Sequence, residues 1–91
     1  MWHAVTPVSE DYDPILYEGD APASLLVLNS GPGTIVARSW NEIGGEDKPS
    51  IRMELRSGNQ RILSGKLVRV HLLSGEFAAV AWQILERIWY G

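Results

Sequence analysis

Turn-forming residues divide this sequence into segments that are too short for most helices. Glycine-containing turns stand near residues 19, 31 and 44, and Ser-Gly pairs follow at 57, 64 and 74, so the spacing is 7 to 13 residues. This spacing is typical of strands in a sandwich or barrel and leaves no room for the helices of a βαβ fold. We therefore predict one all-β domain over residues 1–91, either a single antiparallel β-sandwich or a small barrel of about seven short strands.

The most apolar stretch predicts a central hairpin of two strands, Ser24–Asn29 and Thr34–Trp40, joined by Ser30-Gly31-Pro32-Gly33. Proline presets its own φ and the flanking glycines tolerate positive φ, which suits a tight turn. The first strand is apolar on both faces, with Leu25 and Val27 on one and Leu26 and Leu28 on the other. Both faces therefore need cover, as in a central strand of a two-layer fold or in an oligomer.

Strict alternation marks the second half of the chain. It predicts inward side chains at Ile51, Met53, Leu55, Val68, Val70 and Leu72, and outward ones at Arg52, Glu54, Arg56, Arg69 and His71. Shorter strands are expected at 15–18, ended by the turn 19–22, and at 60–63, ended by Ser64-Gly65. An edge strand is expected near the N-terminus, with Pro7 on its solvent side.

The C-terminal segment Phe77–Tyr90 fits two structures. As a strand it places Ala78, Val80, Trp82 and Ile84 on one face; as a helix it would begin at the N-cap Ser74 and stop at Gly91. The preceding series of turns favours a strand over Glu76–Leu85.

Charge is divided unevenly along the chain. The net charge is −3, but residues 1–47 carry eight acids and one base, whereas residues 48–91 carry seven bases and three acids, so the halves carry −7 and +4. Acidic and basic segments are expected to pair across strands. The alternatives are contact between neighbouring subunits, or a basic face that meets a polyanion.

Catalytic and metal-binding patterns are missing from the sequence, so we predict no enzyme, no metal site and no cofactor. The chain has no cysteine, and neither His3 nor His71 has a second ligand at a metal-like spacing. A solvated acidic turn is a better interpretation than a calcium site for the carboxylates of Asp11, Asp13, Glu18 and Asp20.

Aromatic and leucine side chains supply the candidate contact residues. The candidate interface consists of Trp2, Leu26, Leu28, Trp89 and Tyr90, because tryptophan and tyrosine are enriched at interfaces. The alternative is a sugar-stacking platform made of Trp40, Tyr12 and Tyr17. Trp82 is expected in the core.

Nucleic acid and membrane are not expected partners. The outward arginines Arg52, Arg56 and Arg69 have no aromatic side chains between them, and the net charge is negative. The sequence shows no signal peptide and no transmembrane segment, so we expect a cytoplasmic or virion-associated protein.

The stretch LVLNSGPGTIVA at Leu26–Ala37 resembles the hairpin of bacterial immunoglobulin-like sandwich modules, and residues 53–85 are similar in layout to their closing strands. The span from Leu26 to Leu85 that contains both stretches covers about two thirds of the chain. The resemblance implies an adhesive, spacer or assembly element without catalysis, and no shared site is carried over.

These observations lead to three functional hypotheses. The first is a structural module that associates with itself as a dimer or trimer, or with another protein, for example in a phage or similar particle. The second is a carbohydrate-binding module. The third is an acidic inhibitor or adaptor that presents the Glu42–Asp47 loop to a basic protein.

Overall fold

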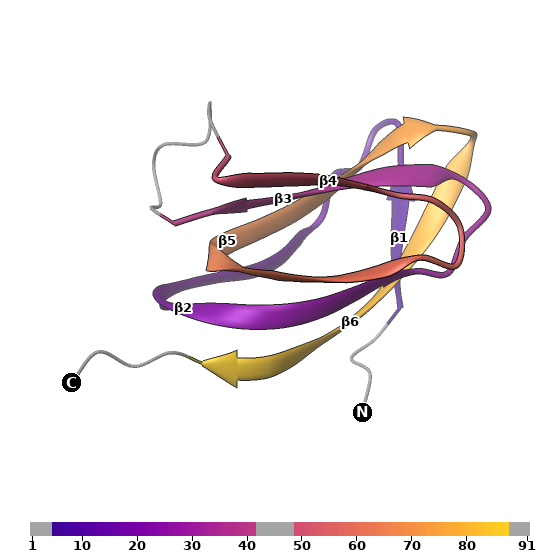
Figure 1. Cartoon of the computed structure of the whole chain (residues 1–91). Coiled ribbons are helices and arrows are strands. Elements are labelled where there is room, and N and C mark those ends of the chain that lie inside the picture. The colour runs from indigo at the N-terminus through magenta and orange to yellow at the C-terminus, as the bar shows by residue number, and fades with distance from the viewer. Residues whose placement is uncertain (1–4, 42–48, 88–91) are drawn as a thin grey trace.

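The computed structural model describes residues 5–41 and 49–87 and contains six β-strands in that part of the chain. They are β1 (Thr6–Ser9), β2 (Ile15–Asn29), β3 (Thr34–Trp40), β4 (Ile51–Leu55), β5 (Gln60–Ser74) and β6 (Phe77–Arg87). They form one open antiparallel sheet in the order β1-β6-β2-β5-β3-β4 (Figure 1). The all-β prediction is confirmed. The helical alternative for the C-terminal segment is wrong, because β6 is a strand.

Two strands are much longer than the sequence predicts. β2 and β5 each have 15 residues, whereas we expected each to be broken by a turn, so there are six described strands and not about seven short ones. The expected turn at 19–22 is instead an irregularity within β2, where the register shifts between Glu18 and Ala23. Both strands bend at the same end of the molecule, so the sheet folds over on itself (Figure 1).

Gly65 lies at the bend of β5, where the sequence predicts the end of a strand. A Cβ atom at this position would lie 2.7 Å from the carbonyl oxygen of Trp40, so only glycine lets the two backbones approach this closely. The Ser64-Gly65 pair therefore bends a continuous strand and does not end one.

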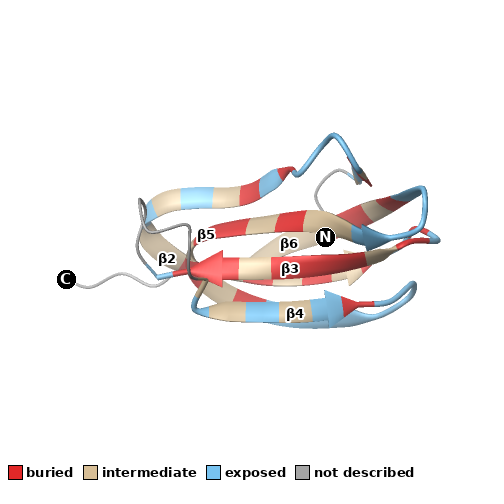
Figure 2. Cartoon of the chain, turned by 90° about the horizontal axis from the view of Figure 1, so that it is seen from above, coloured by how far each residue is buried: buried red, intermediate tan, exposed pale blue. Residues whose placement is uncertain are grey.

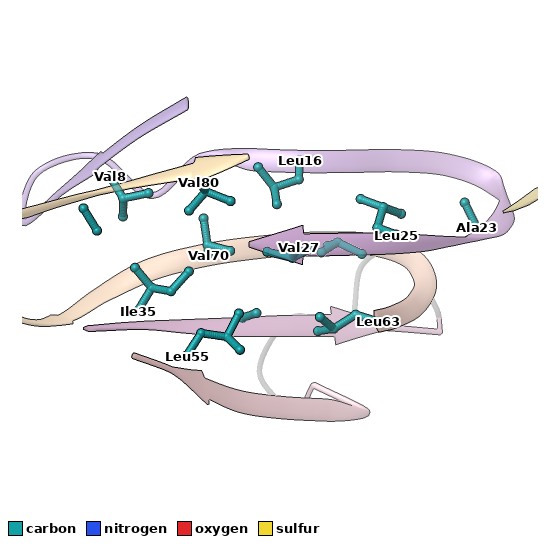
Figure 3. Packing of buried hydrophobic residues seen from close by; sticks show 13 residues of the cluster. Val8, Leu16, Ala23, Leu25, Val27, Ile35, Leu55, Leu63, Val70 and Val80 are labelled. Atoms are coloured by element: carbon teal, nitrogen blue, oxygen red, sulfur yellow. The ribbon is translucent and has the colours of Figure 1, made fainter. Parts of the chain in front are cut away.

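The core lies between the two halves of the folded sheet and receives side chains from every described strand (Figure 3). The predicted alternation is confirmed: Val68 and Val70 of β5 are fully buried, and Leu72 packs against the cluster. Val80 of β6 is buried and Trp82 packs against the core from the same face. Inward side chains thus follow the period of two that the sequence shows.

The predicted central hairpin is wrong in its pairing. β3 begins and ends where expected, but β2 lies between β6 and β5, while β3 lies between β5 and β4. The connection at residues 30–33 therefore carries the chain from one half of the sheet to the other. Its glycines are needed for close approach, because a Cβ atom on Gly31 would clash with the backbone nitrogen of Ala79. Among the described glycines, positive φ occurs at Gly58 and Gly75, which belong to two of the Ser-Gly turns.

Asn29 fixes this connection from inside the protein. Its fully buried side chain donates hydrogen bonds to the carbonyl oxygens of Gly33 (2.7 Å) and Leu55 (2.9 Å). Its Oδ1 atom accepts one from the backbone N–H of Gly31 at 3.1 Å. One amide group thus joins the end of β2, the start of β3 and the end of β4.

The two edges of the sheet differ in how they are protected. β1 is one edge strand and carries an exposed Pro7, as predicted, and it pairs with β6 over four residues. β4 is the other edge and pairs with β3 over five residues.

No helix that could cross a membrane occurs in residues 5–41 or 49–87.

Candidate functional site

Two outward-facing surfaces of the folded sheet differ sharply in chemistry. One lies over β2, the first half of β5 and β6. The other lies over β4, β3 and the second half of β5, which run side by side in Figure 2. β3 is mostly buried in that view, and only Thr34 and Arg38 of this strand are intermediate in exposure.

The first surface is built around two of the predicted interface residues. Leu26 faces Ile62 of β5 on one side and Gln83 of β6 on the other, and Leu28 faces Gln60 and Ala81 in the same way. Leu26 and Leu28 are half-buried and Ile62 is 56% exposed. We call the set Leu26, Leu28, Ile62 and Ala81 the apolar face.

Polar but uncharged side chains border the apolar face. Ser24 and Ser64 face each other across β2 and β5, with their hydroxyl oxygens 2.8 Å apart. The first charge along this row is on Glu86, opposite Ser24 at the end of the β2–β6 pairing. At the rim, Leu85 is exposed in the bulge that shifts this pairing. The surface therefore offers apolar area without a charge at its centre.

Three arginines stand in one line on the second surface. Arg38 of β3 is directly opposite Arg52 of β4 on one side and Arg69 of β5 on the other. We call Arg52, Arg38 and Arg69 the arginine row. Adjacent strands lie about 4.8 Å apart, so the three Cα atoms span about 10 Å. Like charges directly opposite one another are destabilising, so this register opposes the stability of the sheet.

The neighbouring rows contain one tryptophan, one histidine and two carboxylates. Trp40 lies next to Leu67, and the guanidinium carbon of Arg38 is 5.3 Å from the centroid of its ring, a cation–π contact. On the other side of the row, Val36 separates His71 of β5 from Glu54 of β4. Glu18 of β2 pairs with Leu67.

Several polar atoms of this surface are buried without a hydrogen-bond partner. Within the described part of the chain they are Nε of Arg38 and Arg69, Nε1 of Trp40 and Nδ1 of His71. Unpaired buried donors cost stability, and in native proteins each such group calls for an explanation. None of the three arginines forms an ion pair with a carboxylate in residues 5–41 or 49–87.

The charges of the row act on each other's protonation equilibria. Burial lowers the pKa of Arg38, and the positive charges of Arg69 and Arg52 lower it further, while Asp13 opposes them. Burial also lowers the pKa of His71, and Arg38 and Arg52 add to this effect against Asp13. The local field is therefore positive, although the protein as a whole is negative.

The predicted charge pairing across strands fails at this surface. Antiparallel registers align arginine with arginine over three strands, and no acidic residue occupies the row. Alternation in the sequence predicts Arg52 and Arg69 as outward residues, but it gives no role to Arg38, because the apolar residues dominate the pattern of Thr34–Trp40.

The predicted sugar-stacking residues lie in three different settings. Trp40 is only 2% exposed and lies under Arg38, so its ring offers no free stacking face in this structure. Tyr17 packs against the core and donates a hydrogen bond to the carbonyl oxygen of Ala21 at 2.6 Å. Tyr12 is exposed in the turn between β1 and β2.

Other predicted residues lie outside the described part of the chain. These are Trp2, His3, Trp89, Tyr90 and the acidic loop 42–48. Within the described residues, no group of three metal-ligating side chains comes together, and the carboxylates of the β1–β2 region form no such group.

Comparisons with protein-family models, with curated proteins and with solved structures find no match to this chain.

Proposed function

We propose that this domain is a non-catalytic β-sandwich module that associates with a second copy of itself through the apolar face. The observation that carries the proposal is the uncharged pairing of Leu26 with Ile62 and of Leu28 with Ala81 on the outside of the sheet. The core uses the opposite side of these strands, so these side chains are not needed to hold the sheet together.

A second copy is the occupant that best suits this surface. In a two-fold symmetric dimer the same patch meets itself, so a charge near its centre would face its own copy. The apolar face has none, and Ser24, Ser64 and the exposed Gln60 at its border can form the polar rim of an interface. The charged groups lie mainly elsewhere, where they keep the dimer soluble.

Association through the sheet edges is a weaker explanation. β1 carries Pro7, which lacks the N–H that a partner strand would need, and β4 is only five residues long. Contact between faces is therefore favoured over extension of the sheet.

The test is the solution mass of the wild type and of two matched variants, measured by light scattering on a gel-filtration column. We expect a dimer that persists at high salt, because its contact is apolar. Ile62→Glu places a charge in the apolar face and is expected to give a folded monomer. Leu73→Glu changes a comparable residue, 44% exposed on another part of β5, and is expected to stay dimeric.

Far-UV circular dichroism separates loss of association from loss of folding in both variants. A monomeric wild type at the highest soluble concentration would refute the proposal. Equal effects of Ile62→Glu and Leu73→Glu would show that another surface holds the dimer.

A further inference from the structure

The arginine row is an arrangement that the fold does not need. Each strand could present any polar residue on this outer side, yet the register aligns three guanidinium groups and leaves them without an ion pair to a described carboxylate. Asp13 acts electrostatically on Arg38 but forms no ion pair with it. A local rule that is broken without a structural gain points to a functional site.

The guanidinium groups present their donors to solvent. The Nε atoms of Arg38 and Arg69 are buried, but their terminal Nη atoms are not among the buried atoms and donate no hydrogen bond within the described part of the chain. Trp40 supports Arg38 from below through the cation–π contact. The donors are thus held at the surface by packed side chains, which reduces the ordering cost of binding.

We propose that the arginine row binds a compact, multiply charged anion of the phosphate class, such as pyrophosphate or a phosphomonoester. Guanidinium groups bind phosphate oxygens in a bidentate manner, and three of them within about 10 Å match a small group with two or more charges. A single carboxylate would leave most of this positive charge unbalanced.

Extended nucleic acid fits this surface less well. The acidic residues Glu54 and Glu18 lie on the rows that flank the arginines, so a long polyanion would meet negative charge on either side. Base stacking also needs an exposed ring, and Trp40 is buried under Arg38. The site is therefore short, and its ligand is compact.

The proposal predicts an unusual signature for Arg52→Gln. In the free protein this change removes one repulsive pair in the row, so the melting temperature is expected to rise. With pyrophosphate present the same change removes a binding group, so the ligand-induced rise in melting temperature is expected to shrink. An arginine with a purely structural role would not raise the melting temperature of the free protein when it is replaced and also reduce the stabilisation by pyrophosphate.

The experiment is calorimetric titration and thermal melting with pyrophosphate in a phosphate-free buffer at constant ionic strength. We expect saturable binding with one site per chain, and weaker binding of sulfate. Arg52→Gln and Arg38→Gln are each expected to lower the affinity about tenfold, the effect of losing one charged hydrogen-bonding group. Arg61→Gln is the matched control, because Arg61 is exposed elsewhere on β5 and donates to the carbonyl oxygen of Gln60.

Further arms identify the source of the phosphate group. Glycerol phosphate and inorganic phosphate test a phosphomonoester and the free ion, and competition between any of these and pyrophosphate supports a shared site. An oligonucleotide that binds more tightly than pyrophosphate would refute a compact ligand. Equal losses in Arg52→Gln and Arg61→Gln, or no saturable binding by the wild type, would refute the site. If Arg38→Gln fails to fold, the exposed Arg52 still decides the outcome.

Discussion

The apolar face and the arginine row are built on the same sheet by the same alternation of side chains, but each opposes the stability of the isolated domain differently. The apolar face leaves Ile62 exposed to water, which costs hydrophobic free energy. The arginine row holds like charges opposite each other. The inner side of the sheet, in contrast, is apolar apart from the buried Asn29 and Ser39. The side chains at these outward positions therefore lower the stability of the isolated domain, whereas those at the inward positions raise it.

Both surfaces depend on the shared core, and this dependence gives the largest expected effect. Val70 lies between Arg69 and His71 in sequence but points into the core, where it is fully buried. Val70→Asp should unfold the domain, because it loses about 1.5–3 kcal/mol of burial and adds an unpaired buried charge, against a total stability of about 5–10 kcal/mol. Circular dichroism and the melting curve measure the loss.

The control for this prediction is Leu73→Asp on the same strand, where the side chain is exposed and the effect should be small. A folded Val70→Asp protein would contradict the register of β5, and with it the assignment of Arg69 and His71 to the outer surface.

The connection between the two halves of the sheet provides the second test. Asn29→Ala removes the side chain that hydrogen-bonds Gly33, Leu55 and Gly31 inside the protein. Two backbone carbonyl groups and one N–H lose their partner, and we expect a loss of about 2–4 kcal/mol in the free energy of unfolding. Denaturant unfolding measures it.

Asn59→Ala is the matched control for the loss of an asparagine. Asn59 is exposed, and it is its backbone that contacts Asn29, so its side chain should matter little. Similar losses in the two variants would contradict the role given to the Asn29 amide.

The inner side of the sheet could be predicted from the sequence, because burial imposes a period of two that is visible in β4, β5 and β6 without knowing which strands pair. The pairing itself could not be predicted. The stretch at residues 30–33 has the residues of a hairpin turn, and only long-range contacts reveal that its glycines pass close to β6. Local turn chemistry is the same for a hairpin and for a crossing connection.

The same limit applies to the two surfaces. Outward arginines at 52 and 69 are visible in the sequence, but a row exists only because the register aligns them with Arg38. Likewise, the sequence predicts Leu26 and Leu28 as interface residues but not Ile62, because the segment 60–63 has the pattern of a short strand before a turn. A site made by pairing needs the register, and the sequence alone does not determine the register.

The smallest expected effect is a dependence on pH that belongs to the cationic surface alone. Burial lowers the pKa of His71 below its usual value of 6.5, with Arg38 and Arg52 contributing in the same direction and Asp13 opposing them. Arg69 and Glu54 are the other charged groups on this part of the surface. In the unfolded chain His71 therefore takes up its proton at a higher pH than in the folded protein.

It follows that the contribution of His71 to stability is fully present above pH 6.5 and declines as the pH falls from there toward the folded pKa. Nuclear magnetic resonance titration of the His71 ring should give a pKa below 6.5, and pyrophosphate should raise it by adding negative charge beside the ring. His71→Asn should remove this part of the pH dependence while His3 remains as an internal reference. Dimerisation through the apolar face should be unchanged over the same range, because no titratable side chain belongs to that face. A His71 pKa above 6.5 in the free protein would show that Asp13 outweighs the arginines and that the row is already neutralised.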